Sequence, residues 1–155
     1  MGYDVYGLNP KNVEYLEANL PEYFDFSKFS VNSPEYKDWK SKEWEAKAIS
    51  GVYFRQSVGG YWGVLMFWAK KAIEGLPNSI MYNEGYVINE EDAIKIADYI
   101  EPIVVADGFR DVVEEFLTKE YSSKTDNLNE EVDQFIHIVS TFVEFAKNSG
   151  GFRIS

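Results

Sequence analysis

The sequence contains no cysteine, and this absence excludes several kinds of chemistry at once. Disulfide bonds, thiol catalysis, iron–sulfur clusters and thiolate zinc sites all depend on cysteine sulfur. Histidine is almost absent too, because His137 is the only one in 155 residues. Its one acidic companion at helical spacing is Asp133, and two groups do not make a metal site. We therefore interpret His137 as a partly exposed helix residue and expect neither a metal nor a cofactor.

Long apolar runs are also missing. The longest uninterrupted one, 64–69, is far shorter than the roughly 20 residues that span a bilayer. The first residues show neither the basic region nor the apolar core of a signal peptide. We expect a cytoplasmic protein that does not contact a membrane.

Positive charge is scarce, since 15 lysines and arginines face 26 acidic residues and the net charge is −11. Extended binding to nucleic acid needs a basic surface, so we expect no nucleic-acid partner. Acidic clusters occur at 90–92, 114–115 and 130–131, at predicted helix starts or on solvated faces. Capping and solubility explain these clusters, and we predict no catalytic residue.

Apolar spacing at i, i+3, i+4 and i+7 predicts a largely helical chain. Asn9, Ser33 and Asn89 stand where helix N-caps are expected, and Pro102 is predicted to kink or end the helix after Asn89. The stripe Val112, Val113, Phe116 and Leu117 is predicted to be buried, and 122–127 is a polar connection predicted to be exposed. The expected helices are 10–19, 34–49, 61–74, 90–102, 109–121 and 128–148.

Residues typical of strands occupy 3–8, 51–57, 79–88 and 152–154. The third segment is interrupted at 83–85, which indicates a hairpin or an extended segment with a turn. The aromatic stretch 21–31 has no clean periodicity and is predicted to be a packed loop. We predict one α+β domain over 1–155, with about four to six helices packed on a small mixed or antiparallel sheet.

The three arginines, Arg55, Arg110 and Arg153, each follow a phenylalanine. In a strand, neighbouring side chains point to opposite faces, so Arg55 and Arg153 are expected on the face that Tyr6 shares. Guanidinium groups beside aromatic rings suit phosphate and purine. The alternative is that these arginines only pair with surface carboxylates.

Gly59 and Gly60, followed by Tyr61 and Trp62, lie between a predicted strand and a predicted helix. Backbone N–H groups at such a junction can bind phosphate. The spacing matches neither the dinucleotide fingerprint nor the P-loop, so a tight turn is the alternative interpretation.

Four short blocks resemble a family of small uncharacterised bacteriophage and prophage proteins. They read Asp-Val-Tyr-Gly-Leu-Asn-Pro over 4–10, Tyr-Phe-Arg over 53–55, the segment 82–93, and Asn-Ser-Gly-Gly-Phe over 148–152. The sequence departs from the family pattern over 56–62, and 11–50 resembles a family-variable insertion. The resemblance implies a phage context, and so the cytoplasm of an infected bacterial host, but no established activity.

By analogy with accessory phage proteins that counter host defence, our first hypothesis is a non-catalytic protein that sequesters a small nucleotide-like signal. One alternative is an acidic interaction module that blocks a host protein, with Trp39 and Trp44 as exposed anchors; another is a nucleotide hydrolase. The oligomeric state stays open, with a homodimer as one candidate. The expected ligand-binding residues are Asp4, Tyr6, Asn9, Tyr53, Arg55, Gly59, Gly60, Tyr61, Trp62, Asn83, Tyr86, Asn148, Ser149 and Arg153.

Overall fold

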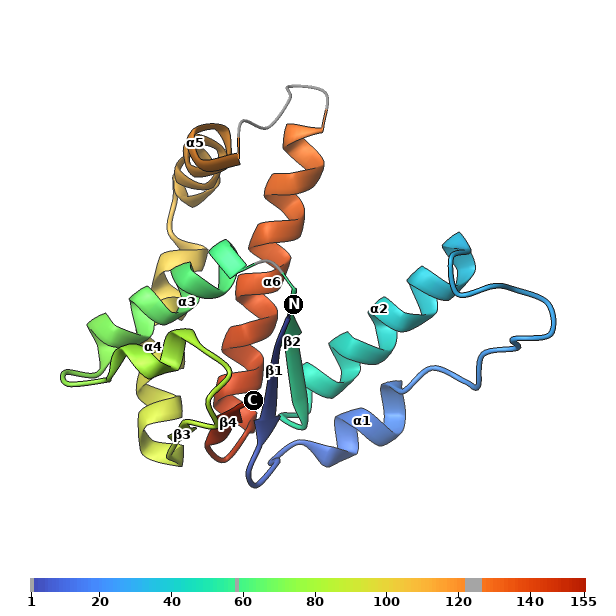
Figure 1. The fold of residues 1–155 in the computed structure, drawn as a ribbon, viewed down its shortest axis with the longest axis horizontal. Coiled ribbons are helices and arrows are strands. Elements are labelled where there is room, and N and C mark those ends of the chain that lie inside the picture. Colours follow the sequence, from blue (N-terminus) through green and yellow to red (C-terminus); the bar gives the residue numbers. More distant parts are fainter. Residues whose placement is uncertain (1, 58, 122–126) are drawn as a thin grey trace.

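The computed structural model describes residues 2–57, 59–121 and 127–155 (Figure 1). Within these ranges a small antiparallel sheet lies against the long C-terminal helix, and two N-terminal helices extend to one side. This confirms the predicted α+β class. The polar connection predicted over 122–127 falls, apart from Asn127, outside the described residues.

The sheet has the order β2-β1-β4-β3, and every neighbouring pair is antiparallel. β2 is therefore at one edge of the sheet, and β1 lies between β2 and β4. The strands are β1 (Tyr3–Gly7), β2 (Tyr53–Gln56), β3 (Val87–Ile88) and β4 (Phe152–Ile154).

Side chains alternate between the two faces of this sheet as the sequence predicts. The inner face packs on the helices and carries buried Val5, Phe54 and Phe152. The outer face carries the polar and aromatic set Asp4, Tyr6, Tyr53, Arg55 and Arg153.

Capping side chains mark two of the helix starts as predicted. Ser33 Oγ accepts a hydrogen bond from the Tyr36 backbone N–H, and Asn89 Oδ1 accepts one from that of Asp92. No helix in the described ranges is long and apolar enough to cross a membrane. The α-helices are α1 (Val13–Asn19), α2 (Pro34–Ile49), α3 (Gly59–Ala72), α4 (Glu90–Val105), α5 (Phe109–Tyr121) and α6 (Leu128–Asn148), and a short 3₁₀ helix, η1, spans Asn78–Met81.

The core forms around α6, which packs against α2, α4 and α5. Phe142 and Phe145 of α6 contact the ring of Phe54 from β2, and both also contact Phe152 from β4. This aromatic cluster joins the helical layer to the inner face of the sheet.

The first helix is shorter and more exposed than predicted. It begins at Val13 rather than at 10, Asn9 is not its cap, and none of its residues is buried. Residues 8–11 are instead held by backbone hydrogen bonds to the turn after α6: the Asn9 N–H donates to Ser149 O, and the Lys11 N–H donates to Asn148 O. These bonds keep the chain out of a helix up to that point.

Two further segments differ from prediction. Most of 79–88 is not a strand, because Ile80 is buried in η1 and its carbonyl accepts a hydrogen bond from Trp62 Nε1 (3.1 Å). The fourth helix continues past Pro102 to Val105, so the proline neither ends it nor prevents the residues after it from staying helical.

One predicted core residue is also misplaced. Val113 and Leu117 are buried on α5 as expected and Phe116 packs against the core, but Val112 is 62% exposed. On the helix Val112 is about 100° from Val113 and about 140° from Leu117, so it lies on the solvent side of the buried stripe.

Three chain segments meet closely at one end of the sheet, at Gly7, Gly51 and Gly150, a meeting point that we call the glycine corner. A Cβ atom on Gly7 would overlap the carbonyl oxygen of Gly51, and one on Gly51 would overlap that of Asn148. Gly51 and Gly150 also have φ angles of 83° and 66°, which disfavour other residues. The ends of α2 and α6 and the end of β1 are thereby held in contact.

We predict that Gly7→Ala lowers the free energy of unfolding by about 3 kcal/mol, because backbone atoms cannot move away as a flexible side chain would. Chemical denaturation measures the change. The matched control is Gly63→Ala in α3, where the added Cβ would lie 3.6 Å from Met81 Cε, an ordinary contact. A Gly7→Ala protein as stable as the control would contradict this account of the corner.

Candidate functional site

A cleft of about 470 Å³ lies between α2, the edge strand β2 and α6. Figure 1 shows that α2 and α6 diverge from each other, and residues of both helices line the cleft. Ala48 and Phe54 are buried residues that line it, and Arg55 lines it from the outer side of β2. Its volume is within the range of small-molecule sites.

More cations than carboxylates line the cleft, although the protein as a whole is acidic. Lys37, Lys40 and Arg55 line it together with only one carboxylate, Glu45, whereas the whole chain has a net charge of −11. His137 from α6 lies 3.9 Å (Nε2 to Oε1) from that carboxylate. This excess applies to the lining side chains, because Lys40 and Arg55 also pair with Glu43 and Asp4, which do not line the cleft. Lining cations favour an anionic ligand.

Aromatic rings line the cleft beside these cations. Tyr36 and Trp44 come from α2, and Tyr61 comes from the first turn of α3. The Trp44 ring lies 5.5 Å from Lys40 Nζ and 5.9 Å from Arg55 Cζ, so both cations are within cation–π distance of it.

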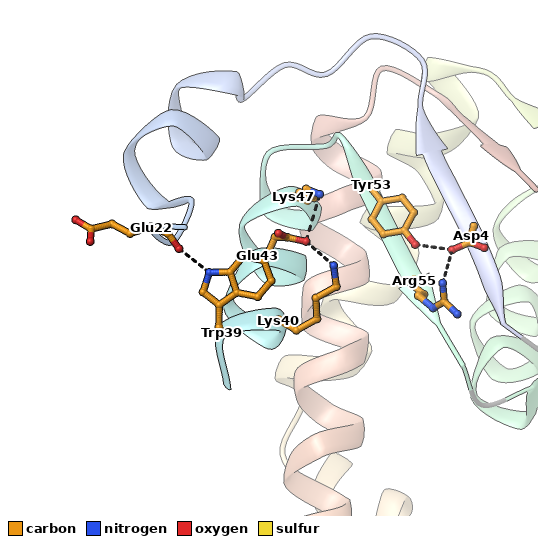
Figure 2. A network of polar contacts seen from close by, with 8 residues as sticks. All are labelled: Asp4, Glu22, Trp39, Lys40, Glu43, Lys47, Tyr53 and Arg55. Carbon is orange, nitrogen blue, oxygen red and sulfur yellow. Dashed lines mark hydrogen bonds and ion pairs between the residues drawn. The ribbon is translucent and has the colours of Figure 1, made fainter. Parts of the chain in front are cut away.

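Lys40 is held in place by a partly buried carboxylate. Glu43 accepts from Lys40 Nζ (2.8 Å) and from Lys47 Nζ (3.4 Å), as Figure 2 shows. Burial alone would raise the pKa of Glu43, but the two lysines lower it below its ordinary value. The carboxylate therefore stays ionised and fixes the position of Lys40 on the cleft wall.

Arg55 is fixed from the other side. Tyr53 Oη and Arg55 Nη1 both donate hydrogen bonds to Asp4 Oδ1, the latter at 3.2 Å (Figure 2). Burial and the bond to the carboxylate raise the pKa of Tyr53 to about 12. The phenol stays protonated at neutral pH, so Asp4 orients a tyrosine and a guanidinium together.

The outer face of the sheet continues from this cluster. Tyr6 is 42% exposed, and its ring centroid lies 5.3 Å from that of Tyr53. Arg153 Cζ lies 5.9 Å from the same Tyr6 ring.

Two of the three arginines form ion pairs. Arg55 pairs with Asp4, and Arg110 pairs with Asp133, as the alternative interpretation expects. Among the described residues no carboxylate lies within ion-pair distance of Arg153.

The predicted site residues thus divide into three groups. Six lie on one continuous surface made of the outer sheet face and the cleft: Asp4, Tyr6, Tyr53, Arg55, Tyr61 and Arg153. This group includes the two strand arginines that the alternation of side chains predicted to share a face.

The second group lies next to the cleft without lining it. Trp62 is fully buried and stacks on Tyr3, with ring centroids 5.1 Å apart, because the apolar helix turns it into the core. Gly59 and Gly60 form the first turn of α3 rather than a turn before it. The predicted phosphate-binding junction is therefore a helix start.

The third group holds the backbone together. Asn148 Nδ2 donates to the carbonyls of Ile49 (3.1 Å) and Glu144 (2.9 Å), and buried Ser149 donates to Ala146 O. These contacts, like those of Asn9 described above, belong to the glycine corner. At the other end of the sheet, Asn83 donates to Gly2 O (2.8 Å) and Tyr86 packs against the core.

The sequence-based prediction missed one wall of the cleft. Lys37, Ser41, Trp44 and Ala48 follow each other at helical spacing along α2, and this spacing is the signal that could have grouped them. On α6, His137 is exposed as predicted, yet it also lines the cleft.

Trp39 differs from its predicted role as an exposed anchor. Its ring packs against Phe24, with centroids 5.6 Å apart, and its Nε1 donates to the carbonyl of Glu22 at 2.6 Å (Figure 2). The residue secures the aromatic loop 21–31 to α2, because an indole in contact with apolar rings still needs a partner for its N–H.

No family model matches this chain, and no curated protein or solved structure matches it either. The resemblance to small phage proteins therefore stays a prediction.

We predict that Tyr53 ionises well above the ordinary pKa of a phenol. A spectrophotometric titration of the wild type minus that of Tyr53→Phe should show a single phenol with a pKa near 12. Folding raises this pKa above its ordinary value of 10.0. The protonated phenol therefore stabilises the folded protein fully below about pH 10, and this contribution is lost as the pH rises to 12.

The same variant should lose about 1 kcal/mol of unfolding free energy at pH 7, as expected for one hydrogen bond. The difference between the two proteins should shrink above pH 10. A difference titration centred near pH 10 would contradict the bond to Asp4.

Proposed function

We propose that this protein binds a small nucleotide-like anion in the cleft and does not convert it. The observation that supports the proposal best is the excess of cations beside aromatic rings on the cleft walls of a strongly acidic protein. Phosphate suits the cations, and a purine or pyrimidine suits the rings.

Each part of the cleft has a distinct role in this proposal. Trp44 and Tyr61 stack against the base, while Lys37 and Arg55 meet the phosphate. The amide of Gln134 on α6 offers both a donor and an acceptor to the edge of the base. Because Asp4 and Tyr53 already orient Arg55, binding loses less side-chain entropy than it would with a mobile arginine.

The biological setting that we propose rests on the resemblance to phage proteins. A protein that captures a nucleotide signal without converting it would sequester that signal from host defence, in the cytoplasm of the infected bacterium. The segment 11–50 contributes the α2 wall. Since this segment is predicted to vary within the family, we expect relatives to prefer different ligands.

A second candidate function is a protein-interaction module that blocks a host protein. The observation that favours it is the aromatic loop, where Tyr23 is 87% exposed and Phe26 is 50% exposed. Of the two tryptophans predicted as anchors, Trp44 is exposed, whereas Trp39 packs against the aromatic loop. Exposed apolar side chains of this kind are typical of protein contact surfaces.

The test is retention of ligand. The purified protein is incubated with a panel of linear and cyclic nucleotides, separated from free ligand and denatured, and the released ligand is analysed by mass spectrometry. We expect an intact nucleotide to be released. A chemically altered one would indicate the hydrolase alternative, and retention of none would overturn the proposal in favour of the interaction module.

Arg55→Ala and Lys37→Ala should each weaken binding of the retained nucleotide about tenfold, which corresponds to about 1.4 kcal/mol. Isothermal titration calorimetry measures the change. Arg110→Ala is the matched control, because Arg110 also forms an exposed ion pair, with Asp133 at 2.5 Å, but does not line the cleft. Equal affinity in Arg55→Ala and the control would contradict the assignment of Arg55.

A further inference from the structure

The outer face of the sheet offers a second stacking surface next to the cleft. Tyr6 stands in the middle of this face, because β1 is flanked by β2 and β4. Tyr53 is its partner in the register on one side, and Arg153 is its partner on the other. The helical layer covers the opposite, inner face. An accessible tyrosine between a second ring and a guanidinium is a surface on which a nucleobase stacks.

Arg55 connects this surface to the cleft. It is the partner of Asp4 in the strand register, so it is a diagonal neighbour of Tyr6, and such neighbours are about 7–8 Å apart. On its other side the guanidinium lies 5.9 Å from the Trp44 ring at the cleft. A guanidinium has five N–H donors, more than the contact with Asp4 uses.

We propose that the ligand is a dinucleotide: one base enters the cleft beside Trp44, the second stacks on Tyr6, and a phosphate that joins them binds Arg55. The inference rests on the proposed function and names the size and charge of its ligand. Two separate stacking surfaces with one cation between them match two bases joined through phosphate.

The distribution of charge supports two nucleotides over one or many. The cations follow a line from Lys37 and Lys40 in the cleft, through Arg55, to Arg153 on the sheet. A mononucleotide would reach only one of the two stacking surfaces that flank Arg55. A long polynucleotide would extend beyond it onto a chain with a net charge of −11, which repels phosphate.

The test compares AMP and GMP with the linear and cyclic dinucleotides of the same bases by isothermal titration calorimetry. We expect at least one dinucleotide to bind ten times or more tighter than the corresponding mononucleotide. Tyr6→Ala should weaken dinucleotide binding about tenfold and weaken mononucleotide binding much less. Tyr6→Phe, which keeps the ring, should restore the dinucleotide affinity.

Tyr99→Ala is the matched control, because Tyr99 is similarly exposed (39%) but lies on α4, in the helical layer. Its dinucleotide affinity should equal that of the wild type. Equal binding of mononucleotides and dinucleotides would overturn this inference and leave the proposed function standing. Binding of neither would overturn both.

Discussion

The close approach of backbones at the glycine corner is the constraint on which the rest of the structure depends. Gly7, Gly51 and Gly150 leave no room for side chains, so the end of β1 contacts the turns that follow α2 and α6. The hydrogen bonds from Asn148 to Ile49 O and from the Asn9 N–H to Ser149 O hold the same point together. This contact places β1 between its two neighbours and makes α2 and α6 diverge from a common origin.

The cleft follows from that divergence. The two helices contact each other; buried Ala48 lines the end of the cleft nearer the corner, and Lys37 and Lys40 line it farther along α2. Small side chains near the origin permit close packing, and long ones farther out reach into the opening. The resulting concentration of positive charge depends on the fold and not on the composition, which is strongly acidic.

The features that depend on local spacing could be predicted from the sequence. The bounds of α5 and α6, the caps Ser33 and Asn89, and the shared face of Arg55 and Arg153 all follow from periodicity within one segment. The cleft could not be predicted in this way, because Lys37 and His137 are a hundred residues apart and meet only through the corner. Conversely, Asn148 and Ser149 were predicted to bind the ligand, and the structure gives both a role in holding the backbone.

The arrangement separates the part of the protein that maintains the fold from the part that surrounds the cleft. Only two residues of α2, Ala46 and Ala48, are buried, whereas Tyr36, Lys37, Lys40 and Trp44 of the same helix line the opening. Substitutions along that wall can therefore change what the cleft selects at little expense to folding. If selection favoured a different small molecule, the residues of this wall could be replaced repeatedly. The sheet, in which Asp4 orients Tyr53 and Arg55, could stay unchanged.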